Sequence, residues 1–228
     1  MLSSGCASVR LRPQTEEPCD GRVHATGLTF IAATPVEVKA LRRALPSARV
    51  VHAGIALARV REDLGATVIS CGLAGGLRAG LPTGTLLIPR TVRRPSGEML
   101  NCDEELVELF AQQARALGIA PVFDPLVTAT SIVVGASRRE WAQRGYAGVD
   151  MESGLLVAPR VAVVRAVLDT PEREISADWR FPVVAMLKPW NWPQAVWLAR
   201  EAPRAAALAA RVAAAAQGIP DEVGIMGQ

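Results

Sequence analysis

The sequence predicts an α/β protein with a mostly parallel central sheet and helices on both faces of that sheet. Short β-branched apolar runs alternate along the 228 residues with longer segments whose apolar side chains recur at helical spacing. Parallel strands need a crossover between them, usually a helix, which produces this alternation. No internal repeat or linker divides the chain. We therefore expect one domain at 27–228, preceded by a loose N-terminal extension at the polar residues 1–26.

Each expected element follows from a local pattern. The run at 28–33 is apolar and partly β-branched, and Pro35 suits the first position of the helix after it. Apolar residues at helical spacing over 103–117, closed by Gly118, predict another helix. The Ala-rich segment at 194–216 predicts a long C-terminal helix. In chain order, the expected strands are 28–33, 48–52, 66–71, 85–91, 126–131, 133–134 and 161–168, and the expected helices are 36–45, 56–64, 103–117, 137–144 and 194–216.

The composition excludes several functional classes. The net charge is +3 and no Lys/Arg block stands out, so nucleic acid is not an expected partner. No apolar run reaches the ~18 residues of a membrane span, so no integral membrane segment is expected. The four cysteines, at 6, 19, 71 and 102, form no CxxC pair and no metal-ligand spacing with the two histidines. We therefore expect a reduced, cytoplasmic protein without a bound metal.

Three carboxylates lie beside apolar runs in the stretch from 148 to 170. Asp150 and Glu152 follow a short strand, and Asp169 ends the β-branched strand at 161–168. A buried carboxylate is costly unless something binds it, and open α/β sheets bind ligands beyond the carboxyl ends of their strands. We therefore expect these acids to face one ligand cleft.

This stretch contains two short motifs, VDMES at 149–153 and VVRAVLD at 163–169. Three more motifs precede them, ATPVEV at 33–38, GLAGGL at 72–77 and PTGTLLI at 82–88. Together they resemble, in the same order, blocks of the nucleoside phosphorylase and nucleosidase family. The family includes methylthioadenosine/adenosylhomocysteine nucleosidase, futalosine hydrolase and hopanoid-associated phosphorylase-like proteins. The resemblance implies a nucleoside phosphorylase-like fold, a small nucleoside as substrate and no cofactor.

The resemblance also implies roles for nine residues. Asp169 matches a general acid that protonates N7 of adenine, and Glu37 matches the base that deprotonates the attacking water. The other seven match residues that contact the nucleoside: Met151 and Glu152 at the ribose, Ala74 and Gly75 beside the ribosyl ring, and Ser131, Ile132 and Val133 on the purine. Local patterns alone allow plainer interpretations: a helix-dipole charge at 37, a tight turn at 72–76 and a strand end at 130–134.

Short segments of the sequence indicate the nucleophile and argue against two other kinds of site, a dinucleotide-binding loop and a catalytic triad. Phosphorylases of the family carry a phosphate-binding loop with an arginine where this chain has 33–38, which contains none, so water is the expected nucleophile. The glycines at 72–80 do not fit a dinucleotide-binding loop, because Pro82 and Gly84 interrupt the helix that would bind phosphate. His52 has no partner Ser or Cys motif for a catalytic triad.

The sequence thus indicates an N-glycosidase that releases adenine from a 5'-substituted nucleoside. The runs at 138–153 and 169–176 are most similar to the hopanoid-associated proteins, which implies adenosylhopane as substrate, whereas 34–37 is also similar to futalosine hydrolase. A phosphorylase, a methylthioadenosine/adenosylhomocysteine nucleosidase and a purine nucleoside binding protein without activity stay open, as does a homodimer. The three tryptophans within 189–197 favour core positions, with an apolar groove for a bulky 5' substituent as the alternative.

Overall fold

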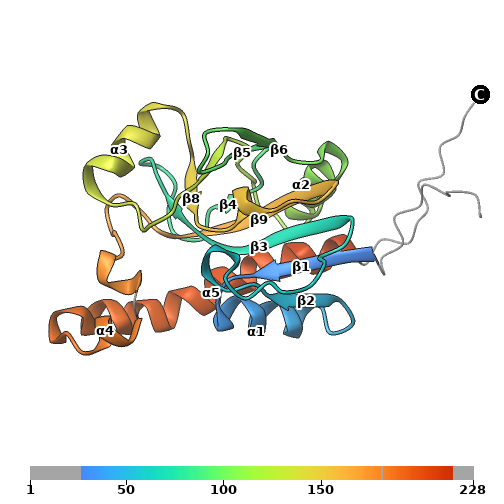
Figure 1. The fold of residues 1–228 in the computed structure, drawn as a ribbon. Helices are drawn as coiled ribbons and strands as arrows, with labels where there is room; N and C mark the ends of the chain where they lie inside the picture. Colours follow the sequence, from blue (N-terminus) through green and yellow to red (C-terminus); the bar gives the residue numbers. More distant parts are fainter. Residues whose placement is uncertain (1–26, 181, 218–228) are drawn as a thin grey trace, which may run out of the picture.

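The computed structural model describes residues 27–180 and 182–217, which form a nine-stranded mixed sheet with five α-helices (Figure 1). The strands are β1 (Leu28–Ala32), β2 (Arg49–His52), β3 (Thr67–Gly76), β4 (Leu86–Leu87), β5 (Thr91–Arg93), β6 (Met99–Asn101), β7 (Leu126–Thr128), β8 (Gly148–Asp150) and β9 (Arg160–Asp169). The α-helices are α1 (Pro35–Ala44), α2 (Glu104–Ala116), α3 (Gly135–Gln143), α4 (Pro182–Met186) and α5 (Trp192–Gln217). Four 3₁₀ turns complete the list: η2 (Ile55–Leu57), η3 (Ser153–Leu155), η4 (Ala177–Arg180) and η5 (Pro189–Asn191). The expected extension at 1–26 lies outside the described residues.

The strands follow the order β2-β1-β3-β8-β7-β5-β6, and β9 pairs with β3 and β4. Of the eight strand pairs in the described residues, β3–β8, β4–β9 and β5–β6 are antiparallel and the other five are parallel. Figure 1 shows α1 and α5 below the sheet and α3 above it. The predicted fold class, an α/β protein with a mostly parallel sheet between helices, is therefore confirmed.

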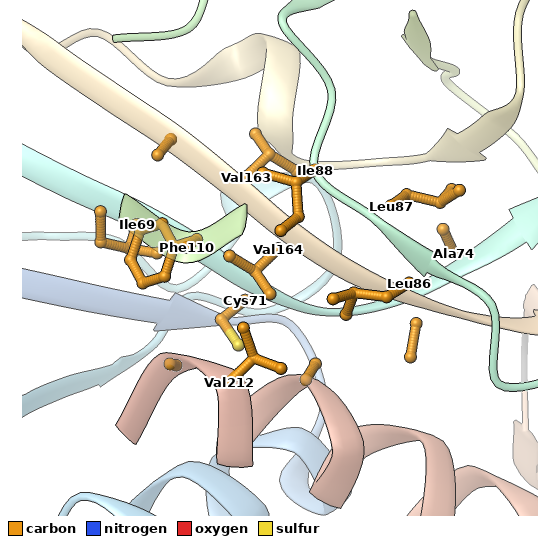
Figure 2. Packing of buried hydrophobic residues seen from close by; sticks show 14 of the residues in the cluster. Ile69, Cys71, Ala74, Leu86, Leu87, Ile88, Phe110, Val163, Val164 and Val212 are labelled. Atoms are coloured by element: carbon orange, nitrogen blue, oxygen red, sulfur yellow. The ribbon is translucent and has the colours of Figure 1, made fainter. Parts of the chain in front are cut away.

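The centre of the molecule is the parallel pair β3 and β9. Both strands are buried along almost their whole length, as their apolar composition predicts for strands covered on both faces. Figure 2 shows Cys71 of β3 and Val163 and Val164 of β9 among side chains that include Phe110 of α2 and Val212 of α5. Because the two strands run parallel, their carboxyl ends meet at one edge of this rigid core.

Four local expectations were wrong. The helix expected at 56–64 is replaced by the short turn η2, where Ala56 and Leu57 have φ values of 53° and 57°. This left-handed conformation cannot continue a right-handed helix. The strand expected at 126–131 ends at Thr128, because its neighbour β8 ends opposite it at Asp150. Residues 129–134 instead form a connection between β7 and α3, so the separate strand expected at 133–134 is absent. The strand expected at 85–91 is divided into β4 and β5, because residues 88–90 are not in a strand.

The glycine-rich block at 72–76 extends β3 and does not form the alternative tight turn. Strand β9 pairs with it along this length, with a register shift between Ala74 and Gly75. On the other side, Gly76 pairs with Gly148 of β8. A strand segment with so few side chains leaves room for groups that approach its backbone closely.

Candidate active site

A cavity of about 230 Å³ lies at the carboxyl ends of β3 and β9, beside the first turn of α1. Two buried arginines, Arg138 and Arg165, contact acids of this cavity and were not assigned from the sequence. All nine residues that were assigned lie in its lining: Glu37, Ala74, Gly75, Ser131, Ile132, Val133, Met151, Glu152 and Asp169.

Glu37 is held in place by the start of α1. The N-cap residue Thr34 donates from its backbone N and its Oγ1 to Glu37 Oε2, both at 2.7 Å, and completes a capping box. The other carboxylate oxygen accepts a hydrogen bond from the backbone N of Leu73 at 2.7 Å. A Cβ at Gly72 would collide with this carboxylate, so the glycine leaves the space that the carboxylate occupies. The carboxylate therefore borders the cavity in a fixed orientation.

Arg165 of β9 is a fully buried cation shared by three carboxylates. Its Nη2 lies 2.8 Å from Asp150 Oδ2 and 3.4 Å from Glu152 Oε2, and its Nη1 lies 3.6 Å from Glu37 Oε1. Burial alone would lower the pKa of Arg165, but the three carboxylates raise it above its ordinary value. With three acids around one guanidinium, this side of the cavity carries more negative than positive groups.

Asp150 has a structural position within this cluster. Thr128 Oγ1 donates to its Oδ1 at 2.7 Å, and Ser153 donates from its backbone N at 3.2 Å and from its hydroxyl. These bonds tie together the ends of β7 and β8 and the turn η3. Because its oxygens are occupied, Asp150 orients Arg165 and leaves contact with a ligand to the neighbouring acids.

Glu152 is the acid of the cluster that titrates near neutrality. Burial raises its pKa to about 7; Arg165 opposes this rise, and the Asp150 and Glu37 carboxylates add to it. Its Oε1 accepts a hydrogen bond from the backbone N of Ala56 at 3.2 Å. A carboxyl group with such a pKa can both donate and accept hydrogen bonds, which suits contact with sugar hydroxyls.

Asp169 ends β9 and forms a buried ion pair between its Oδ2 and Nη2 of Arg138. Arg138 also donates to the carbonyl of Gly76 at 2.8 Å and to that of Val133 at 3.2 Å. Burial raises the pKa of Asp169, and Arg138 opposes this rise without cancelling it. The other oxygen, Oδ1, lies against β3, where a Cβ on Gly75 would be 3.0 Å away. Asp169 is therefore an acid that holds its proton more strongly than an exposed aspartate.

The two carboxylates lie at different places along β3. Glu37 borders Gly72 and Asp169 borders Gly75, three residues apart on an extended strand, which corresponds to roughly 10 Å along the backbone. An acid and a base at two places along one cavity can act on different atoms of one bound molecule.

The sequence could have predicted the burial of one of the two arginines but not of the other. Arg165 interrupts the apolar run at 161–168, and a cation in a core strand requires acidic partners, so its burial among acids could have been predicted. Arg138 gives no such signal, because the segment 137–144 is polar and its inward direction depends on tertiary packing. In the structure Arg138 donates hydrogen bonds to the Val133 carbonyl, so this carbonyl already has a partner before any purine binds.

Of the three tryptophans expected in the core, one is buried and two are exposed. Trp197 is buried as predicted, but Trp190 and Trp192 are 72% and 56% exposed, so the prediction of core positions is wrong for these two. None of the three lines the cavity. Within residues 27–180 and 182–217 no group of three or more His, Cys, Asp or Glu side chains is placed to hold a metal ion, and no helix there is long and apolar enough to cross a membrane.

The architecture is that of the α/β nucleosidases, a class whose solved structures resemble this chain over most of its length. S-adenosylhomocysteine nucleosidase from Streptococcus pyogenes has a TM-score of 0.65 at 15% identity and covers 87% of this chain and 100% of its own. A variant of the Helicobacter pylori methylthioadenosine nucleosidase, with 5'-methylthioadenosine in its active site, has a TM-score of 0.64 at 12% identity, with coverages of 84% and 97%.

Futalosine hydrolase from Helicobacter pylori gives the same TM-score of 0.64 at 12% identity, and again covers 84% of this chain and 97% of its own. Comparison of the sequence with protein-family models and with curated proteins finds no match. At these identities the likeness establishes a shared fold, and it confirms the nucleosidase-type fold that the short sequence motifs implied.

Proposed function

We propose that this protein is a nucleosidase that hydrolyses the N-glycosidic bond of a 5'-substituted adenine nucleoside and releases adenine. The observation that carries the proposal is the placement of Glu37 and Asp169 in one cavity, each bordering a different part of β3. Proteins of the same fold that are named as nucleosidases or futalosine hydrolase add support.

The reaction follows from the two acids. Asp169 donates its proton to N7 of adenine, so that the base leaves as a neutral molecule when the C1'–N9 bond breaks. Positive charge develops on the ribosyl ring, and the excess of carboxylates around Arg165 stabilises it. Glu37 accepts a proton from water as the water oxygen bonds to C1'. Glu152, with Met151 beside it, binds the ribose hydroxyls.

Water is favoured over phosphate by the charges at Glu37. A phosphate nucleophile needs unpaired cations, and the guanidinium closest to Glu37 belongs to Arg165, which three carboxylates already share. Arg138 is likewise engaged with Asp169 and two carbonyls. A dianion would therefore meet net negative charge near the base, which opposes its binding.

The 5' substituent is proposed to be apolar and bulky. Ile55, which lines the cavity and has no role at the purine or the ribose, contributes an apolar side chain that fits a thioether or hydrocarbon substituent. Together with the motifs at 138–153 and 169–176, this favours adenosylhopane and a place in hopanoid biosynthesis. We assign the activity to the domain at 27–228 of a cytoplasmic protein; the free, buried thiols of the two described cysteines fit a reducing compartment.

A substrate panel tests the proposal. Adenosine, methylthioadenosine, adenosylhomocysteine, futalosine and adenosylhopane are incubated with the protein, with and without phosphate, and free base is quantified. We expect adenine release that does not depend on phosphate and is fastest with adenosylhopane. Turnover that requires phosphate would show a phosphorylase, and the fastest release from another member of the panel would replace the proposed substrate.

Glu37→Gln is expected to stop hydrolysis, because an amide cannot accept the proton from water. Glutamine can keep the capping box with its one oxygen, but its NH2 group then faces the backbone N–H of Leu73, so thermal unfolding is measured beside turnover to show that the variant is folded. Glu104→Gln is the matched control, because Glu104 also lies in a first helical turn but is exposed. If both variants keep full turnover in a free-base assay, Glu37 is only a helix-dipole charge.

A purine nucleoside binding protein without activity is the second candidate. The Arg138–Asp169 ion pair favours it, because a guanidinium stabilises the carboxylate form that cannot donate a proton. Calorimetry with methylthioadenosine and adenosylhopane, followed by analysis of the recovered nucleosides, separates the two candidates. Tight binding with every nucleoside recovered intact would establish the binding protein.

A further inference from the structure

The segment from 183 to 196, called here the 183–196 surface, carries most of the exposed apolar side chains of the described residues. Seven of their twelve exposed large hydrophobic residues lie in it. Leu187 is 78% exposed, Val183 77% and Trp190 72%. Scattered single apolar residues are normal on a protein surface, but a contiguous group marks an interaction site.

The fold itself turns these side chains outward. The segment is anchored from inside by buried Asn191, whose Nδ2 donates to the carbonyl of Ala185 at 3.2 Å and to Asp178 Oδ2 at 3.1 Å. Lys188 pairs with the same aspartate at 2.6 Å, and Trp192 Nε1 donates to the carbonyl of Met186 at 3.1 Å. The polar groups are thus satisfied within the segment, and its apolar side chains remain on the outer side.

The position and the charge of the 183–196 surface indicate which kind of partner it binds. Figure 1 shows α4 and the first turns of α5 projecting beyond the sheet, away from its centre. Lys188 lies in the segment and is paired with Asp178, and exposed Arg200 lies one helical turn beyond it. Exposed tryptophans next to basic residues are typical of segments that lie at the boundary of headgroups and acyl chains.

We propose that the 183–196 surface docks on a lipid bilayer that contains anionic lipids. Leu187, Val183 and the two exposed tryptophans would enter the interfacial region without spanning it. Basic residues at the edge of the surface, such as exposed Arg200, would contact the anionic headgroups. A projecting tip of this kind fits a deformable lipid surface better than the flat, self-complementary face that a twofold dimer requires.

The surface is also connected to the candidate active site. Gln194, in the first turn of α5, accepts a hydrogen bond from the backbone N of Ser176 at 2.9 Å and donates to the Glu174 carbonyl at 2.9 Å. The Glu174 carboxylate in turn accepts from the backbone N of Gly135 at the start of α3. The chain that follows Asp169 is therefore pinned between the docking surface and α3. The docking proposal itself does not depend on the nucleosidase activity.

Vesicle flotation tests the proposal with the full chain. Vesicles of phosphatidylglycerol and phosphatidylethanolamine are compared with vesicles of phosphatidylcholine alone. We expect the protein to float with the anionic vesicles and its tryptophan emission to shift to shorter wavelength. Leu187→Asp combined with Trp190→Asp should weaken binding by roughly tenfold or more, the order expected when one or two apolar side chains lose their burial. Arg200→Glu should weaken binding at low salt.

The matched control is Val157→Asp, because Val157 is 87% exposed but lies outside the 183–196 surface. It should float like the unchanged protein. Failure of the unchanged protein to float, or an equal loss with Val157→Asp, would overturn the proposal. Sedimentation velocity supplies the second arm. A dimer that the Leu187→Asp/Trp190→Asp variant converts to a monomer would assign the surface to a second copy of the chain and would also overturn lipid docking.

Discussion

Two opposing effects act on the pKa of the Asp169 carboxyl group. Burial favours the protonated form, and the guanidinium of Arg138 favours the anion, with burial the stronger of the two. If Asp169 is the general acid, Asp169→Asn keeps the shape of the side chain but has no proton to donate. We expect the turnover rate to fall by ~10²–10⁴ while the dissociation constant of the nucleoside stays within about tenfold. Steady-state assays and calorimetry measure the two quantities, and near-normal turnover would remove Asp169 from this role.

Arg138→Met tests the ion pair separately from the chemistry. Removing the cation leaves a buried carboxylate without its partner, which typically costs ~3–5 kcal/mol of unfolding free energy. Combining Arg138→Met with Asp169→Asn removes both charges, so the double variant should regain much of this stability. Urea unfolding of the two single variants and the double variant measures the coupling. Additive losses would mean that the two side chains do not interact.

The missing side chain at Gly72 matters for the site because the Glu37 carboxylate occupies the space that a Cβ would take. A Cβ at this position would collide with the Glu37 carboxylate and lie 2.8 Å from Nη1 of Arg165. Gly72→Ala should therefore displace Glu37 and reduce turnover strongly while the sheet still forms. Gly27→Ala is the control, because nothing lies within 4 Å of a Cβ there. Full activity in Gly72→Ala would contradict the fixed position of Glu37.

At the scale of helices and strands, the sequence predicts the elements that are specified by residues close together in the chain. Helix α1 forms as expected, because Pro35 and the Thr34–Glu37 capping box act within one turn. Strand β9 forms because its run is continuously apolar apart from Arg165. The turn at Ala56 could not be predicted, because the backbone N of this left-handed residue donates to Glu152, which is distant in sequence. The inward direction of Arg138 was missed for the same reason.

Helix α5 shows how an element's composition sets its packing. Ala209 is completely buried against the sheet, whereas Ala207, two positions earlier, is exposed. Ala209→Leu should lower the unfolding free energy by ~1–3 kcal/mol, because the added atoms have no space in a closely packed core. Ala207→Leu should leave stability nearly unchanged. Thermal unfolding of the pair is the measurement, and equal effects would mean that α5 does not pack as described.

At the scale of the whole molecule, the sheet assembles a site from residues far apart in the chain. The two main acids come from α1 and from the end of β9, and the cations come from α3 and β9. The resemblance to family motifs indicated which residues gather, because motif order implies a shared topology. It could not indicate their protonation, because the pKa shifts arise from burial that only the assembled core produces.

The same burial makes stability depend on pH in a defined direction. Glu152 has a pKa of about 7 in the folded protein and an ordinary value of 4.5. Between these values the folded state keeps a proton that the unfolded state releases, so stability falls as pH rises through this window. The difference of 2.5 pH units corresponds to about 3 kcal/mol at ~1.36 kcal/mol per unit. Asp169, whose pKa is also raised, contributes in the same direction.

We therefore expect the unfolding free energy of the unchanged protein to decrease between pH 4.5 and 7 relative to that of Glu152→Gln, which has no proton to lose at this position. Urea unfolding of both proteins at several pH values gives the difference directly, and Glu104→Gln serves as an exposed control. The difference should level off above pH 7, once Glu152 is ionised in both states. A constant difference across this range would show that Glu152 is already ionised in the folded protein, with Arg165 outweighing burial.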